Sequence, residues 1–156
     1  MLFRSSNEQS LLRRARAYMG PPELHDYAFE ADVFGVEKRR QLPDIGIIAQ
    51  RYGLVLAGNA QKLWIESWQP EIKRTRTIPF EWKGNVWYRM KLRVDNVAGG
   101  KALVRGKVWL KGSPEPEQWT IEREDPIPNQ AGAPGFYAYA HNEVYYDNIK
   151  VSENSK

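Results

Sequence analysis

The chain has 156 residues, of which 42% are hydrophobic and 27% charged, and its formal net charge is +4. This length suits one domain with a two-layer core, and the composition excludes a disordered chain. Because the chain has no cysteine, a disulfide framework and a thiolate metal site are excluded. No apolar run of 18 residues is present, which excludes a membrane-spanning helix.

The first twenty residues have the weakest pattern. Residues 10–19 fit a short helix that opens at Ser10, or an edge strand in which Arg14, Arg16 and Tyr18 alternate with apolar side chains. Gly20 and the two prolines after it end either element. We therefore divide the chain into an N-terminal segment, residues 1–20, which is an edge strand or only a chain end, and a domain, residues 21–156.

From residue 27 onward, apolar side chains recur at every second position, which is typical of half-buried β-strands. Turn-forming residues separate the segments, and residues 58–60 and 95–101 have hairpin composition. This pattern predicts an all-β sandwich or barrel. The expected strands are residues 27–33, 45–52, 54–56, 62–68, 87–94, 102–110, 118–123, 136–140 and 144–151, with 70–79 as a loop or edge segment.

Several strands carry aromatic and charged side chains on the face opposite their apolar residues. Aromatic rings stack on sugar rings, and charged side chains bond sugar hydroxyls or carboxylates. We therefore predict a glycan-binding face, with the excess of Arg and Lys favouring an acidic glycan. A solvated face with cross-strand charge pairs is the alternative. The predicted ligand-binding residues are Arg51, Trp64, Glu66, Trp68, Arg89, Arg105, Trp109, Tyr137 and Tyr139.

Catalysis is a second hypothesis, because glycosidases use pairs of carboxyl groups. Glu30 and Asp32 stand two positions apart on one polar strand face, and Glu66 is a third candidate acid. A third alternating acid does not follow Asp32, since Phe34 stands there. The alternative interpretation, which we favour, is that Glu30 and Asp32 pair with nearby Arg or Lys.

The sequence contains no strong metal or cofactor motif. Its two histidines, His25 and His141, lack the spacing of a zinc site. Asp147 and Asn148 are candidate ligands for one structural calcium ion, although Asp-Asn is also ordinary turn chemistry. We expect no other cofactor. The basic residues form no long block, so we expect neither nucleic acid nor a membrane as a partner.

Three segments resemble strands of concanavalin-A-like domains. They are YAFEAD at residues 27–32, WYRMKLRV at 87–94, and GFY at 135–137 followed by VYYDNIKV at 144–151. Their order and spacing cover residues 24–152. The resemblance implies a two-sheet antiparallel jelly-roll sandwich, which narrows the fold class that the strand pattern predicts.

Five further segments resemble the C-terminal domain that follows a PQQ-like β-propeller in some exported bacterial proteins. They are KRRQ at 38–41, DIG at 44–46, AQRY at 49–52, SWQPE at 67–71 and DPIPN at 125–129. The resemblance implies an extracytoplasmic accessory domain with no bound quinone, whose targeting signal lies outside this chain. Wider relatives include the 3-keto-disaccharide hydrolase family, from which we carry no active residue over to this sequence.

Three functions follow as hypotheses: a non-catalytic carbohydrate-binding or accessory domain, a glycoside-acting enzyme, and an interaction domain that docks on a neighbouring propeller. A glycan site should be a groove with exposed rings, whereas a docking face should be flat and apolar at its centre. An enzyme should show two carboxyl groups about 5–10 Å apart across a cleft.

Overall fold

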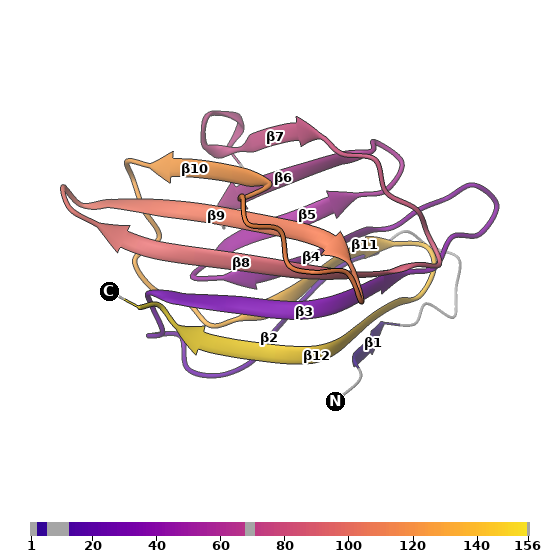
Figure 1. The fold of residues 1–156 in the computed structure, drawn as a ribbon, viewed down its shortest axis with the longest axis horizontal. Coiled ribbons are helices and arrows are strands. Elements are labelled where there is room, and N and C mark those ends of the chain that lie inside the picture. The colour runs from indigo at the N-terminus through magenta and orange to yellow at the C-terminus, as the bar shows by residue number, and fades with distance from the viewer. Residues whose placement is uncertain (1–2, 6–12, 68–70, 156) are drawn as a thin grey trace.

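Two antiparallel β-sheets pack face to face in a computed structural model that describes residues 3–5, 13–67 and 71–155 (Figure 1). Sheet A consists, in spatial order, of β1 (Phe3–Ser5), β12 (Val144–Glu153), β3 (Tyr27–Gly35), β8 (Trp87–Val97), β9 (Lys101–Leu110) and β10 (Ile121–Asp125). Sheet B consists of β2 (Arg13–Tyr18), β11 (Gly135–Ala140), β4 (Asp44–Ala49), β5 (Tyr52–Ala57), β6 (Lys62–Ser67) and β7 (Arg76–Pro79).

The strand order confirms the predicted jelly-roll sandwich. Strands that are distant in sequence lie side by side, such as β12 beside β3 and β11 beside β4. The 3-10 turn η1 (Ile72–Arg74) is the one helical element in the described part of the chain. Within that part, no helix has the length and hydropathy needed to cross a bilayer.

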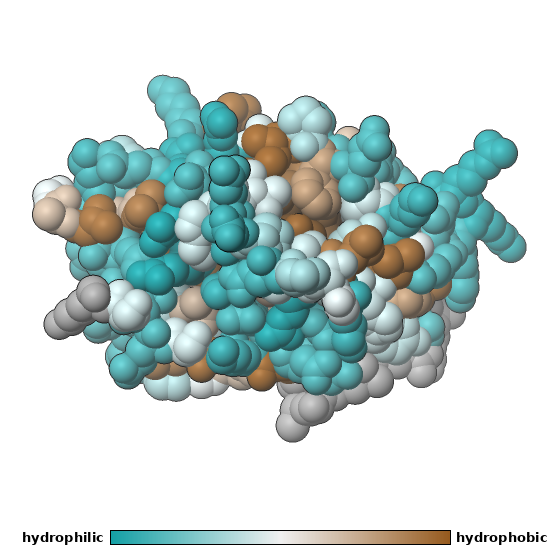
Figure 2. Space-filling view, viewed as in Figure 1, coloured by the Kyte–Doolittle hydropathy of each residue, from teal (hydrophilic) through white to brown (hydrophobic). Residues whose placement is uncertain are grey.

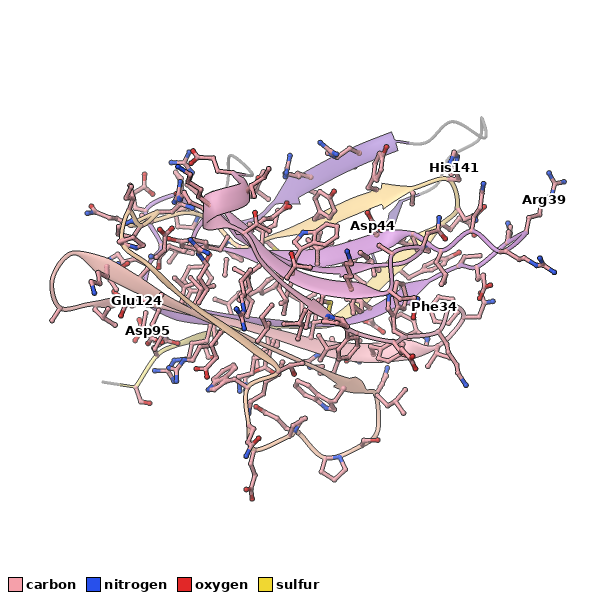
Figure 3. The ribbon with its side chains drawn as sticks, turned by 90° about the horizontal axis from the view of Figure 1, so that it is seen from above. Phe34, Arg39, Asp44, Asp95, Glu124 and His141 are labelled. Atoms are coloured by element: carbon pink, nitrogen blue, oxygen red, sulfur yellow. The ribbon has the colours of Figure 1, made fainter. Side chains whose placement is uncertain are left out.

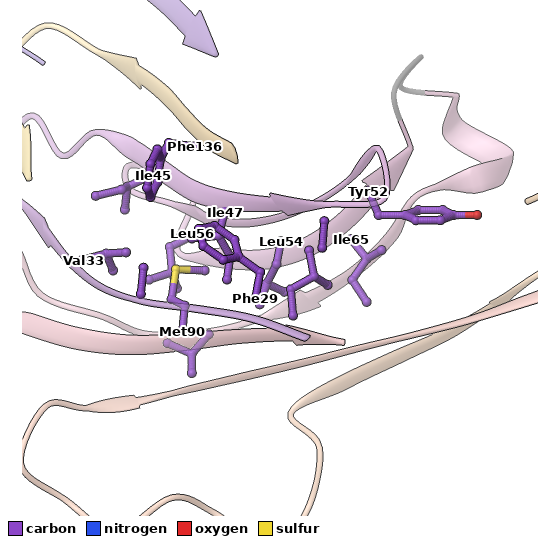
Figure 4. Close-up of a cluster of buried hydrophobic side chains, with 14 of the residues drawn as sticks. Phe29, Val33, Ile45, Ile47, Tyr52, Leu54, Leu56, Ile65, Met90 and Phe136 are labelled. Carbon is purple, nitrogen blue, oxygen red and sulfur yellow. The ribbon is translucent and has the colours of Figure 1, made fainter. Parts of the chain in front are cut away.

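The core lies between the two sheets and follows from strand alternation. Phe29 of β3 and Met90 of β8 point from sheet A toward Ile47 and Leu54 of sheet B, and all four are fully buried (Figure 4). Side chains at the intervening positions point away from this core. Each sheet therefore has an outer face, and the polar residues of the sequence divide between these two faces.

The N-terminal segment is part of the sandwich. Residues 13–18 form β2, which pairs along its whole length with β11, so the edge-strand prediction is confirmed and the helix alternative is wrong. Residues 3–5 form β1 and extend sheet A beside β12. The alternation of Arg14, Arg16 and Tyr18 therefore places these three side chains on one face of sheet B.

Candidate functional site

The predicted ligand-binding residues do not form one surface. Strand alternation assigns a side chain to a face but does not say which sheet carries its strand, and the prediction of a single face is wrong for this reason. Trp68 lies outside the described residues. The outer face of sheet A carries Arg89, Arg105 and Trp109, the outer face of sheet B carries Trp64, Glu66, Tyr137 and Tyr139, and Arg51 stands in the turn between β4 and β5.

Ion pairs occupy the outer face of sheet A. Arg89 bonds Glu30 at 3.1 Å and Asp32 at 3.2 Å, and Lys111 bonds Asp32 at 3.0 Å. Burial pushes the pKa of Asp32 upward, but hydrogen bonds from Asn148, Lys111 and Arg89 outweigh burial and lower it. The pairing interpretation of Glu30 and Asp32 is confirmed. Asp32 is held ionised by these partners, which does not suit a proton donor.

The segment between β9 and β10 adds a second layer to this face. Glu115 bonds both Lys91 and Lys107 at 3.0 Å, and the Trp119 ring lies 4.9 Å from the Arg105 guanidinium and 4.7 Å from the Lys107 ammonium. Figure 2 shows the resulting surface, which is hydrophilic over most of β3, β8 and β9. The cations of this face are therefore already neutralised by the protein.

Asp147 and Asn148 lie at an irregularity in β12, beside β3. The Asn148 side-chain amide donates to Asp32 at 2.6 Å, and its backbone carbonyl accepts from Arg89 at 2.5 Å. Asn148 thus already bonds Asp32 and Arg89 within the protein, and the calcium ion at Asp147 and Asn148 stays a prediction.

The outer face of sheet B is built differently. Register places five residues of successive strands in one transverse row: Arg16, Tyr137, Gly46, Val55 and Trp64. Small side chains occupy the middle of the row and large ones its two sides. Val55 and Tyr137 are buried against Trp64 on this outer face, apart from the main core. We call this row the trough, because larger side chains flank the small Gly46 and Val55 at its middle.

An ion pair shows that sheet B curls around this trough. Arg16 lies on β2 and Glu66 on β6, with three strands between them. Four strand spacings separate backbones by about 19 Å in a flat sheet, which is beyond the reach of the two side chains. Nevertheless, Arg16 Nη2 lies 3.5 Å from Glu66 Oε1. The β2 edge must bend toward β6, and Figure 3 shows β2 standing beyond the middle strands on the outer side.

The carboxyl groups of this face are poorly neutralised. Burial raises the pKa of Glu66, and the hydrogen bond from Trp64 Nε1 (3.0 Å) and the charge of Arg16 only partly oppose it. Burial likewise raises the pKa of Asp44, which accepts the Gly58 N–H at 2.9 Å. Both shifts show carboxylates that lack the compensation present on sheet A.

The trough opens at one end into a larger hollow. Beneath the Arg16–Glu66 pair only about 10 Å³ is free, in a pocket that Tyr18 and Arg51 also line. The same Tyr18 and Arg51 line a hollow of about 750 Å³, closed on the other side by residues 128–133. The Tyr18 ring is 43% exposed at the rim. The hollow thus combines a ring, a guanidinium and backbone amides.

A buried glutamine fixes the wall of the hollow. Gln50 is fully buried, accepts the Asp26 N–H at 3.0 Å, and donates to the Asn96 side chain at 2.6 Å and to the Asn129 carbonyl at 2.7 Å. Asn129 donates in turn to the Arg51 carbonyl at 3.0 Å. These bonds hold the 128–133 loop against the β4–β5 turn, so the hollow is preformed.

Sequence reasoning missed three residues of this site. Arg14, Arg16 and Tyr18 lie on β2, and the guanidinium carbons of Arg14 and Arg16 stand 5.0 and 5.2 Å from the Tyr139 and Tyr137 ring centres. Their two-residue alternation was visible in the sequence. The sequence does not reveal that β2 pairs with β11, and this pairing places Arg14 and Arg16 beside Tyr139 and Tyr137.

The comparisons with known proteins identify the fold. The chain aligns with galectin LEC-6 of Caenorhabditis elegans over 96% of both chains, at 8% identity and a TM-score of 0.58. It aligns with an endo-β-1,4-glucuronan lyase of Trichoderma reesei over 96% of this chain and 78% of that chain (12% identity, TM-score 0.55). A β-1,3-glucanase of Mycobacterium marinum aligns over 97% and 73% (12% identity, TM-score 0.52).

These likenesses show a concanavalin-A-like jelly-roll fold. No family model matches the chain, and no curated protein matches it. The resemblances to the propeller-associated domain and to the 3-keto-disaccharide hydrolase family stay predictions, as does the extracytoplasmic location. Fold similarity alone does not assign a function, which has to be inferred from the chemistry of the trough and the hollow.

Proposed function

We propose that the outer face of sheet B binds carbohydrate, with the hollow at Tyr18 and Arg51 as its open end. One observation carries the proposal: Tyr18 and Arg51 line a hollow of about 750 Å³ and also the small pocket at Arg16 and Glu66, so a ring and a guanidinium connect the hollow to an under-neutralised carboxyl. Rings offer stacking surfaces, and Arg and Glu offer bonds to hydroxyls. The shared fold of a galectin and of two enzymes named for their glycans supports a sugar ligand.

Binding requires the Arg16–Glu66 pair to open, because the pair leaves only about 10 Å³ beneath it. Sugar hydroxyls or a sugar carboxylate replace Glu66 as the partner of Arg16. Glu66 is suited to this exchange, since burial already raises its pKa and favours its neutral form. Because Glu66 can take up a proton when Arg16 leaves it, opening the pair does not leave a buried charge without a partner.

A binding function is better supported than glycosidase chemistry. Glu66 lies on β6 and Asp44 on β4, with β5 between them. The register pairs Glu66 through Gly53 with Ile48, which is four residues along β4 from Asp44. The backbones of Glu66 and Asp44 are about 16 Å apart by strand geometry, so the carboxyl groups reach the spacing of about 5–10 Å of a catalytic pair only if both side chains extend toward each other. Instead, Asp44 bonds Gly58 and Glu66 bonds Trp64. The trough also differs from a docking face, because its centre is bridged by an ion pair rather than being flat and apolar.

The experiment is a glycan array with acidic and neutral polysaccharides, run with calcium and with chelator, followed by titration calorimetry on each hit. We expect Tyr18→Ala and Trp64→Ala each to weaken binding roughly tenfold through loss of a stacked ring. Trp109→Ala, on the outer face of sheet A, is the matched control and should leave affinity unchanged. Circular dichroism verifies that each variant is folded. Affinity lost equally in Trp109→Ala, or retained in both sheet B variants, contradicts the proposed face.

A further inference from the structure

A second feature at the far end of sheet B presents unpaired charge. Lys38 and Gln41 exchange two backbone hydrogen bonds of 2.9 and 3.3 Å, so Arg39 and Arg40 form a two-residue hairpin turn. Their φ angles are 54° and 61°, both in the left-handed region that a type I′ turn requires. Asn and Gly are preferred there because other side chains crowd the backbone. This turn therefore holds two arginines in an unfavourable conformation.

Two other turns show how this conformation is usually compensated. The β8–β9 turn uses Gly99 and Gly100, for which a positive φ carries no steric penalty. The β4–β5 turn places Gln50 at a φ of 49° and Arg51 at 64°. The three hydrogen bonds of the buried Gln50 side chain, and the one that the Arg51 carbonyl accepts from Asn129, hold this turn in place. Arg39 and Arg40 are exposed and, among the described residues, have no hydrogen bond or ion pair. Within residues 3–5, 13–67 and 71–155, no side-chain contact of the two arginines compensates this turn.

The base of the hairpin is nevertheless rigid. The Leu42 N–H donates to the Asn59 side chain at 3.0 Å, which ties the hairpin to the β5–β6 turn. A methyl group added at Gly58 would overlap Pro43 and Leu42, and one at Gly84 would overlap Glu37. The tip projects from this tightly packed base, and Figure 3 shows Arg39 at the extremity of the molecule. The base thus holds in place the backbone that carries the two cations.

We propose that this hairpin (residues 36–43) binds an anionic polysaccharide whose chain continues from the sheet B trough. The inference rests on the proposed function. The hairpin leads directly into β4, whose six residues span about 20 Å of the trough floor. Exposed Arg14 and Lys62 stand at the same end of the trough. A linear polymer that leaves the trough at this end meets the arginines next.

Charge complementarity selects an anionic ligand. The hairpin carries three basic residues and one acidic residue, Glu37, which gives a net charge of +2. Guanidinium groups bond carboxylates and sulfates with two donors each, so uronate and sulfated sugars share the required chemistry. The cations of sheet A are unavailable for such a ligand because ion pairs already neutralise them.

The test replaces Arg39 with Asn and Arg40 with Gly in one variant. This change removes two charges and supplies the residues that a type I′ turn prefers, so Tm should rise by about 2–4 °C. Titration uses polyglucuronate, dextran sulfate and neutral β-1,3-glucan at several salt concentrations. We expect affinity for at least one anionic polymer to fall roughly tenfold at low salt. The dependence of log K on log salt should become shallower by about one unit.

Two controls separate charge from shape. Arg39→Lys with Arg40→Lys keeps the charge and should retain most of the affinity. Lys101→Gln with Lys150→Gln removes two charges from sheet A and should leave the affinity unchanged. Unaltered polyanion affinity in the Asn-Gly variant overturns the inference, and so does an equal loss in the sheet A control. Equal hairpin-dependent binding of a DNA duplex overturns the choice of a polysaccharide.

The outcomes also distinguish this inference from the proposed function. If polymer binding depends on Tyr18 and Trp64 but not on the hairpin, the proposed function stands and the inference fails. If polyanion binding depends on the hairpin but not on those two rings, the trough is not the binding site, and the continuous path proposed here is overturned as well.

Discussion

The two outer faces of the sandwich carry similar residues under opposite electrostatic conditions. On sheet A, the hydrogen bonds and charges of neighbouring cations outweigh burial and lower the pKa of Asp32 and Asp95. On sheet B, burial raises the pKa of Glu66 and Asp44 beyond what their partners offset. A face whose carboxylates are paired with cations of the same protein stabilises the fold. A face whose carboxylates lack such partners is available to bind an external ligand. Composition alone would not separate them.

The largest expected effect tests the structural role of sheet A. Arg89→Met leaves Glu30 and Asp32 without their main partner, and removal of one member of a buried ion pair is strongly destabilising. We expect a loss of about 3 kcal/mol, at the lower end of the usual range because Lys111 still bonds Asp32. Urea denaturation at pH 7 measures it.

The matched change on sheet B should have a smaller effect. Arg16→Met removes the partner of Glu66, but Glu66 can take up a proton, since its pKa is already raised. The loss should be about 1 kcal/mol or less. Equal losses in Arg16→Met and Arg89→Met would mean that the two faces do not differ in the way proposed.

The pH dependence of stability should have opposite signs for the two faces. The lowered pKa of Asp95 contributes stability that is present above the ordinary value of 3.8 and is lost as pH falls through the lowered pKa. The raised pKa of Glu66 contributes stability that is present below its ordinary value of 4.5 and is lost as pH rises through the raised pKa.

Two variants therefore separate the faces by pH. Asp95→Asn should lower the free energy of unfolding at pH 7. This loss should become smaller as the pH falls. Glu66→Gln should stabilise the protein at pH 7, with the gain vanishing below about pH 4.5. Urea midpoints measured from pH 3 to pH 8 give both profiles. Shifts of the same sign in the two variants would remove the distinction between the faces.

The smallest effect concerns an exposed pair on sheet A. Lys101 and Glu124 approach to 2.7 Å, but their side chains are 43% and 56% exposed. Water screens such a pair, so Lys101→Met should change the free energy of unfolding by less than about 0.5 kcal/mol. The same denaturation assay checks this, and a loss comparable to that of Arg89→Met would show that burial is not what distinguishes these pairs.

The sequence was sufficient for the fold and for the orientation of most side chains. Alternation placed Met90 and Leu92 inside and Arg89 and Lys91 outside, because a strand has a period of two. Alternation does not reveal which strands share a sheet, so Trp64 and Trp109 were assigned to one surface although they lie on opposite faces.

The curl of sheet B was beyond sequence reasoning for a related reason. The meeting of Arg16 with Glu66 depends on how five strands bend together, and no local pattern near either residue encodes it. The hairpin was a different case. Its three consecutive basic residues were visible in the sequence, but the left-handed φ angles of Arg39 and Arg40 were not.

The buried Gln50 also has a consequence for the time course of folding. Its turn between β4 and β5 is local, but the side-chain partners lie 24, 46 and 79 residues away along the chain. Loops of such length close slowly, and all-β topologies fold in milliseconds to seconds for this reason. Because three long loops must be closed before all the Gln50 bonds can form, we expect these bonds to form late in folding, so that Gln50→Ala accelerates unfolding more than it slows folding.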